Sequence, residues 1–94
     1  MGVERRRYVF RGRVQGVGFR ATAYRLAQDH DVTGYVRNQP DGSVELVAEG
    51  DPAAIDALVS RLRQTFGPLI QRADFVTEPP GGPAASFADF TIRY

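Results

Sequence analysis

The hydrophobic pattern of this chain changes its period several times, and the order of those changes limits the fold more strongly than any other feature. Residues 7–14 alternate with a period of two and place Tyr8 and Phe10 on one face, which is typical of a half-buried strand. From Phe19 the apolar positions recur with helical spacing as far as His30. The chain therefore begins with a strand and a helix of about three turns.

The middle of the chain predicts a β-hairpin. After the turn-prone residues 31–34, two short apolar runs occupy residues 35–38 and 44–48. The turn between them contains Pro40, which presets one backbone angle, and Gly42, which tolerates a positive one. Two adjacent strands are therefore expected directly after the first helix.

A second helix is the clearest element of the chain. Asp51 suits the N-cap position and Pro52 the first helical position, whereas Gly67 and Pro68 mark the end. The apolar side chains of this helix share one stripe, which consists of Ile55, Leu58, Val59, Leu62 and Phe66. Such a stripe requires a sheet or another helix to cover it.

The last third of the chain predicts two more strands, at residues 75–77 and 90–94. Residues 78–83 between them are rich in proline and glycine and are expected to form a mobile loop. This order predicts an α+β fold, the ferredoxin-like β-α-β-β-α-β sandwich, with an additional C-terminal strand. Both helices should cover one face of an antiparallel sheet.

Length and composition limit what such a fold can do. The 94 residues, of which 43% are hydrophobic, suffice for one domain, residues 1–94. The chain has no cysteine and all twelve basic residues are arginine, which excludes thiolate metal sites, cysteine nucleophiles and Schiff-base lysines. A net charge of +1 argues against a nucleic-acid binder, and no apolar run is long enough for a membrane span, so a cytoplasmic protein is expected. The arginines at 5–7 are interpreted as a solvated tail.

The segment between the first strand and the first helix has the composition of an anion-binding loop. It consists of Gly12, Arg13, Val14, Gln15, Gly16, Val17, Gly18, Phe19 and Arg20. Glycines let successive backbone N–H groups turn inward around an anion, and the start of a helix adds unpaired donors. Arg20 would add a guanidinium that matches two phosphate oxygens. An ordinary tight turn also explains these glycines, so the spacing alone leaves both interpretations open.

Asn38 is a second candidate, because it ends a predicted strand just before the hairpin turn. Its amide offers an acceptor and two donors, so it could hold a water molecule beside a phosphate. An asparagine at this place is also a common turn residue that bonds to its own backbone. This residue alone leaves both interpretations open.

Together, the two segments resemble both signatures of the acylphosphatase family. Residues 12–20 are followed at matching offsets by Gly34, Tyr35, Val36, Arg37, Asn38, Gly42, Val44 and Gly50. The resemblance spans the whole chain and implies hydrolysis of small-molecule acyl phosphates to a carboxylate and inorganic phosphate, without a metal or organic cofactor. It also implies that Arg20 binds the phosphoryl group and that Asn38 orients the attacking water.

The expected substrate-binding loop consists of Gln15, Gly16, Val17, Gly18, Phe19 and Arg20. In phosphoryl transfer a protein mainly positions the phosphate and stabilises charge on its equatorial oxygens, which backbone N–H groups and one guanidinium can do. Members of the family place the terminal carboxylate close to the catalytic arginine. The resemblance therefore implies that the Tyr94 carboxylate pairs with Arg20 in the empty site, but a last strand that serves only for packing is an equally good interpretation.

Two other functions are considered. An RNA-binding module shares this element order but stacks bases on aromatic side chains of the open sheet face. The residues expected there are Val9, Arg11, Arg13, Ser43, Glu45, Val47 and Glu49, none of which is aromatic. The main alternative is a non-catalytic or regulatory anion-binding domain of the acylphosphatase type, since such domains also begin larger carbamoyltransferases. A chain that ends with its own strand favours a free-standing monomer.

The remaining polar candidates are interpreted as structural. His30 lies about 15 Å along the helix from the loop, too far to act there as a general base. Asp29, Asp31 and Asp41 lack the dense spacing of a calcium loop and are expected to be caps and turn residues. No metal site is therefore expected.

Overall fold

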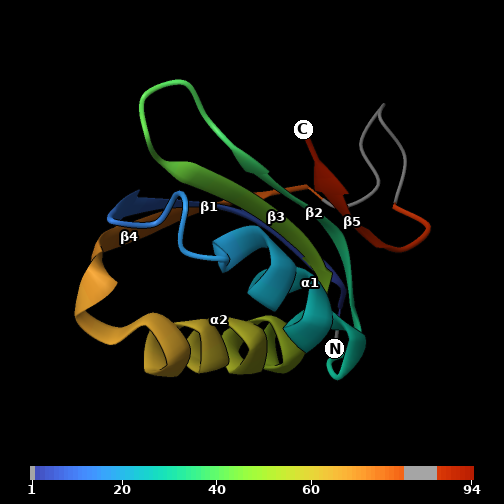
Figure 1. The fold of residues 1–94 in the computed structure, drawn as a ribbon. Coiled ribbons are helices and arrows are strands. Elements are labelled where there is room, and N and C mark those ends of the chain that lie inside the picture. Colours follow the sequence, from blue (N-terminus) through green and yellow to red (C-terminus); the bar gives the residue numbers. More distant parts are fainter. Residues whose placement is uncertain (1, 80–86) are drawn as a thin grey trace.

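The computed structural model describes residues 2–79 and 87–94. Figure 1 shows a strongly twisted sheet with both α-helices on the same side. The elements in chain order are β1 (Glu4–Gly12), α1 (Phe19–Gln28), β2 (Val32–Asn38), β3 (Val44–Gly50), α2 (Pro52–Phe66), the 3₁₀ turn η1 (Gly67–Leu69), β4 (Ile70–Glu78) and β5 (Phe90–Arg93). The predicted α+β, ferredoxin-like architecture is confirmed.

The strands form one sheet in the order β4-β1-β3-β2-β5. The pairs within β4-β1-β3-β2 are antiparallel, as predicted, but β5 runs parallel to β2. The sheet is therefore mixed, because β4 and β5 lie at opposite edges and the chain enters β5 in the direction of β2 (Figure 1). This parallel pair places the end of β5 beside Asn38, the last residue of β2.

The interpretation of the first arginines as a solvated tail is wrong. β1 begins at Glu4 rather than at residue 7, and Arg5 and Arg6 are only 7% and 9% exposed. Arg5 pairs with Glu49 at 3.0 Å, and Arg6 pairs with Asp56 at 2.6 Å. These acidic partners come from β3 and α2, so the arginines are buried by charge pairing rather than by an apolar pattern.

Two other strands are longer than predicted. β2 starts at Val32, inside the stretch predicted as a turn. Gly34 is a strand residue rather than a turn residue, and because it has no side chain the β3 backbone can approach it closely. A Cβ at Gly34 would lie 1.8 Å from the Val47 carbonyl oxygen. β4 covers nine residues, of which only three were predicted, since this edge strand is mostly exposed and has no clear alternation. Residues 80–83 of the predicted loop lie outside the described residues.

The core lies between the helices and the sheet. All five residues of the α2 stripe are buried, as are Tyr8 and Phe10, in agreement with the predicted faces. The centroid of the Phe19 ring lies 5.0 Å from the centroid of the Phe10 ring and 4.8 Å from that of the Phe66 ring. The first residue of α1 is thus fixed in the core, which holds the start of this helix, and the loop before it, in place.

His30 follows α1 rather than lying within it. Its Nδ1 atom is 2.8 Å from the Leu26 carbonyl oxygen, so the ring closes the end of the helix, as expected. Among the described residues no helix is long and apolar enough to cross a membrane, and no cluster of three His, Asp or Glu side chains could hold a metal ion.

Candidate functional site

The loop between β1 and α1 has a backbone that depends on glycine. Gly16 and Gly18 have φ angles of +76° and +82°, in the left-handed region that other residues rarely adopt. Gly18 is the N-cap of α1, and no side chain caps this end of the helix. The sequence therefore bends sharply into the helix and leaves its first turn open.

The loop is held at both ends by backbone hydrogen bonds. Arg13 N–H donates to the Leu69 carbonyl at 2.9 Å, and Thr22 N–H donates to the Gly18 carbonyl at 3.0 Å. Between these points, within the described residues, no hydrogen bond uses a backbone N–H of residues 15–20 as donor. Unpaired N–H groups at a helix start are suited to bind an anion, because the positive end of the helix dipole coincides with them.

A hollow of about 180 Å³ opens beside this loop. Its polar lining comes from Gly16, Gly18, Arg20 and Asn38, and its apolar lining from Val14, Phe19, Ala21, Ile92 and Tyr94. Arg20 lies in the first turn of α1 and Asn38 at the end of β2, so the fold brings together the two predicted catalytic residues. In the described parts of the chain, no acidic side chain lines the hollow, which leaves the Arg20 charge available to an anion.

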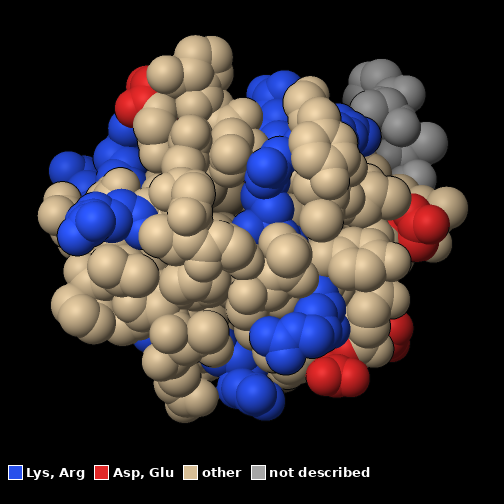
Figure 2. Space-filling view, viewed as in Figure 1, with Lys and Arg blue, Asp and Glu red and all other residues tan. Residues whose placement is uncertain are grey.

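The surface charge is compatible with an anionic ligand. In Figure 2, arginine side chains reach the surface near the centre of the view, whereas acidic side chains lie toward its edge. The net charge of the whole chain is only +1, so any local positive potential depends on the arrangement of the charged side chains rather than on the composition.

Arg20 does not make the predicted contact with the terminal carboxylate. Among the described residues no ion pair joins the two groups; instead the Arg20 Cζ atom lies 4.8 Å from the centroid of the Tyr94 ring. The physical reason is that β5 ends at Arg93, and the ring of the following residue turns onto the guanidinium. Tyr94 therefore contacts Arg20 with its aromatic ring rather than with its carboxylate.

Gln15 and Val17 do not line the hollow with their side chains. Val17 is exposed. The amide nitrogen of Gln15 donates to the carbonyl oxygens of Gln39 at 2.8 Å and Ser43 at 2.9 Å. This side chain therefore connects the loop to the β2–β3 hairpin that follows Asn38, a role that sequence reasoning missed because its partners are distant backbone atoms.

The hairpin itself is rigidly organised around Asp41. Its carboxylate accepts hydrogen bonds from the backbone N–H of Ser43 at 3.0 Å and from Arg11 at 3.1 Å. The side-chain hydrogen bond from Ser43, followed by the backbone bond and Arg11, lowers the pKa of Asp41 to about 2. The turn that follows Asn38 is thus held in one shape at neutral pH.

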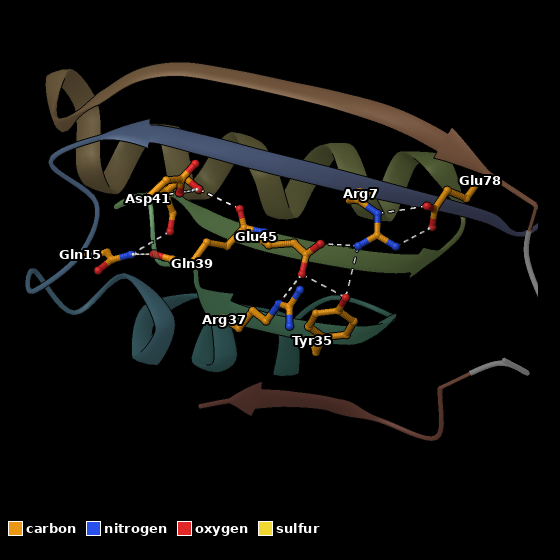
Figure 3. Close-up of polar contacts among 9 residues, drawn as sticks. Arg7, Gln15, Tyr35, Arg37, Gln39, Asp41, Glu45 and Glu78 are labelled. Atoms are coloured by element: carbon orange, nitrogen blue, oxygen red, sulfur yellow. Dashed lines mark hydrogen bonds and ion pairs between the residues drawn. The ribbon is translucent and has the colours of Figure 1, made fainter.

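A charged cluster lies on the face of the sheet away from the helices (Figure 3) and holds β2, the strand that ends at Asn38. The Glu45 side chain is only 4% exposed and accepts hydrogen bonds from Arg37 Nε at 2.6 Å, Tyr35 Oη at 3.1 Å and Arg7. Burial would raise the pKa of Glu45, but the bonds from Arg7, Arg37 and Tyr35 outweigh it and the pKa lies below its ordinary value. Arg37, which directly precedes Asn38, is therefore fixed to β3.

This face differs from the one expected for an open sheet. Glu45 and Glu49 are buried beneath arginines rather than solvated, and Ser43 is also buried. Tyr35 lies on this face and contacts the Phe87 ring edge-on at 5.8 Å, whereas the expected residues included no aromatic. The aromatic side chain belongs to β2, outside the two central strands to which the expectation applied.

Comparison with known proteins decides the family. Residues 6–92 match the family described as Acylphosphatase. The chain belongs to the acylphosphatase family. It is 50% identical to an acylphosphatase from Yersinia pseudotuberculosis over 88 residues, which cover 93% of this chain and 91% of that protein.

Solved structures agree with the acylphosphatase assignment. The crystal structure of acylphosphatase from Bacillus subtilis is 29% identical, with a TM-score of 0.82 over 97% of this chain and 99% of that one. HypF from T. kodakarensis is 33% identical with a TM-score of 0.80, and there the match covers 97% of this chain but 12% of that much longer chain. The acylphosphatase fold thus occurs both as a whole chain and as part of a larger one.

Proposed function

We propose that this chain hydrolyses the carboxyl–phosphate bond of acyl phosphates to give a carboxylate and inorganic phosphate. Membership of the acylphosphatase family supports the reaction class. The observation that carries the proposal is the shared hollow, in which Arg20, Asn38 and the glycines of the 15–20 loop meet although they come from different elements.

The phosphoryl group binds at the start of α1. The N–H groups of residues 15–20 and the Arg20 guanidinium surround its oxygens and stabilise the charge that they carry during transfer. The side chain of Gln15 is already engaged by the hairpin, so its contribution to binding is its backbone N–H.

Asn38, at the end of β2, orients the attacking water. Its side chain lines the hollow, and its amide can accept from water while donating to a phosphate oxygen. A carboxylate leaving group needs no general acid, and the water's proton passes to the substrate's own phosphate. His30 is not needed as a base and does not line the hollow.

We also propose that residues 1–94 act as a single acylphosphatase-like domain, a monomer in the cytoplasm that needs no metal and binds neither nucleic acid nor membranes. The near-neutral net charge supports the lack of nucleic-acid binding, and the lack of cysteine is compatible with a reducing compartment.

A second candidate is a non-catalytic or regulatory anion-binding domain. The likeness to a short part of T. kodakarensis HypF favours it, because the same fold there belongs to a much longer chain. Such a domain would bind phosphate in the same hollow without turnover.

Phosphate release from benzoyl phosphate distinguishes these functions. The purified chain should release phosphate well above spontaneous hydrolysis in excess EDTA, and should act poorly on phenyl phosphate, whose leaving group is more basic and benefits from an acid. Binding of phosphate without turnover would support the second candidate, and activity restored only by a divalent metal would contradict the metal-independent mechanism.

A further inference from the structure

The lining of the hollow combines polar and apolar groups, and the phosphoryl group uses only the polar ones. The polar lining includes Gly16 and Gly18 of the loop and the Arg20 side chain. The apolar lining includes Ile92 from β5 and Tyr94, which follows the strand. An acyl phosphate likewise combines a charged phosphoryl group with an acyl group, which must extend beyond the N–H donors that hold the phosphate.

Tyr94 has an unusual combination of position and exposure. Its side chain lines the hollow and its ring lies 4.8 Å from the Arg20 Cζ atom, yet the residue is 98% exposed. A large aromatic ring that is left in water at the rim of a binding site gains from being covered by an apolar group.

The contact with Arg20 places the Tyr94 ring beside the proposed phosphate-binding group. The guanidinium is the group proposed to grip the phosphate, and the ring that it contacts is therefore within reach of an acyl group attached to that phosphate. Ile92, half-buried and packed against the core, lines the same hollow two residues before Tyr94 and adds a fixed apolar surface to it.

We propose that Tyr94, supported by Ile92, is the platform for the acyl group, and that the chain favours acyl phosphates with an aromatic acyl group over short aliphatic ones. This inference rests on the proposed acylphosphatase function. Stacking of two aromatic rings strengthens binding by about two- to tenfold beyond simple area burial, which sets the size of the preference that Tyr94 can provide.

The test compares kcat/KM for benzoyl phosphate and acetyl phosphate in the wild type, Tyr94→Leu and Tyr94→Trp. The benzoyl-to-acetyl ratio should fall about two- to tenfold in Tyr94→Leu and be retained in Tyr94→Trp. Tyr24→Leu is the matched control, because Tyr24 is a 43% exposed tyrosine on α1 that does not line the hollow, and its ratio should equal that of the wild type.

The ratio separates specificity from a general effect on the site. If Tyr94 only orients Arg20, both substrates lose the same factor in Tyr94→Leu and the ratio stays unchanged, which overturns the inference. Hydrolysis of neither substrate by the wild type would instead refute the proposed function itself, and the inference with it.

Discussion

Replacing Gln15 by methionine removes the link between the phosphate loop and the hairpin after Asn38 while keeping a side chain of similar length. The two lost hydrogen bonds, at 2.8 and 2.9 Å, are each worth about 0.5–1.5 kcal/mol net. Neither carbonyl is left without a donor, because Gly42 N–H still donates to Gln39 and Gln39 N–H to Ser43. We therefore expect a loss at the lower end, about 1–2 kcal/mol in the free energy of unfolding.

Thermal unfolding and steady-state kinetics measure the two consequences of this change. For a domain of this size the expected loss lowers Tm by about 5–15 °C. At a temperature where both proteins are fully folded, kcat/KM for benzoyl phosphate should also fall, since the loop and Asn38 are no longer held at a fixed separation.

Arg11→Met is the matched control, because the Arg11–Asp41 pair also ties β1 to the hairpin but lies at the exposed surface. It should change Tm less than Gln15→Met and leave kcat/KM near that of the wild type. If Gln15→Met were as stable as the wild type, the two bonds would not brace the hairpin. A destabilised Gln15→Met enzyme with unchanged kcat/KM would refute the link between hairpin position and activity.

Three further predictions concern the framework of the site. Glu45→Ala should lower the free energy of unfolding by about 1–3 kcal/mol in urea titrations, because it removes the buried carboxylate that accepts hydrogen bonds from Arg7, Arg37 and Tyr35. Since its folded pKa is depressed, the Glu45 contribution should be fully present above its unfolded pKa of about 4.3 and be lost as the pH falls through the lower folded value; constant stability from pH 7 to 3 would contradict this. Gly34→Ala should be far more destabilising than Gly42→Ala, because, of these two positions, only Gly34 would bring the new Cβ against backbone atoms. Equal losses of unfolding free energy in the two variants would contradict the close approach of the β3 backbone to Gly34.

The parts of the fold that local signals specify were predictable from sequence. Asp51 accepts a hydrogen bond from Ala53 N–H at 2.9 Å and Pro52 begins α2, as the capping pattern indicated. The loop glycines at 16 and 18 adopt the positive φ angles that make glycine necessary there. Such features depend on neighbouring residues only, and therefore survive in the folded protein.

Features that depend on distant partners were not predictable. Arg5 and Arg6 are buried because Glu49 and Asp56, from remote segments, neutralise them, and an arginine run gives no sign of this. The contact of Arg20 with the Tyr94 ring likewise depends on where β5 ends relative to α1. The meeting of Arg20 and Asn38 followed from family resemblance rather than from the spacing of either residue.

In the proposed mechanism, Arg20 binds the phosphoryl group and Asn38 orients the water within one hollow. The most direct test measures kcat for benzoyl phosphate together with the inhibition constant of inorganic phosphate in Arg20→Ala, Arg20→Lys and Asn38→Ala. Arg25→Ala, which removes an arginine from the last turn of the same helix and away from the hollow, is the control and should behave as the wild type.

We predict that Arg20→Ala lowers kcat/KM by at least about a hundredfold and weakens phosphate inhibition, with little recovery in Arg20→Lys because an ammonium cannot replace the guanidinium fork. Asn38→Ala should lower kcat by about a hundredfold while the phosphate inhibition constant stays within about twofold of the wild type. If Asn38→Ala weakened phosphate binding as much as Arg20→Ala does, the division of labour would be wrong.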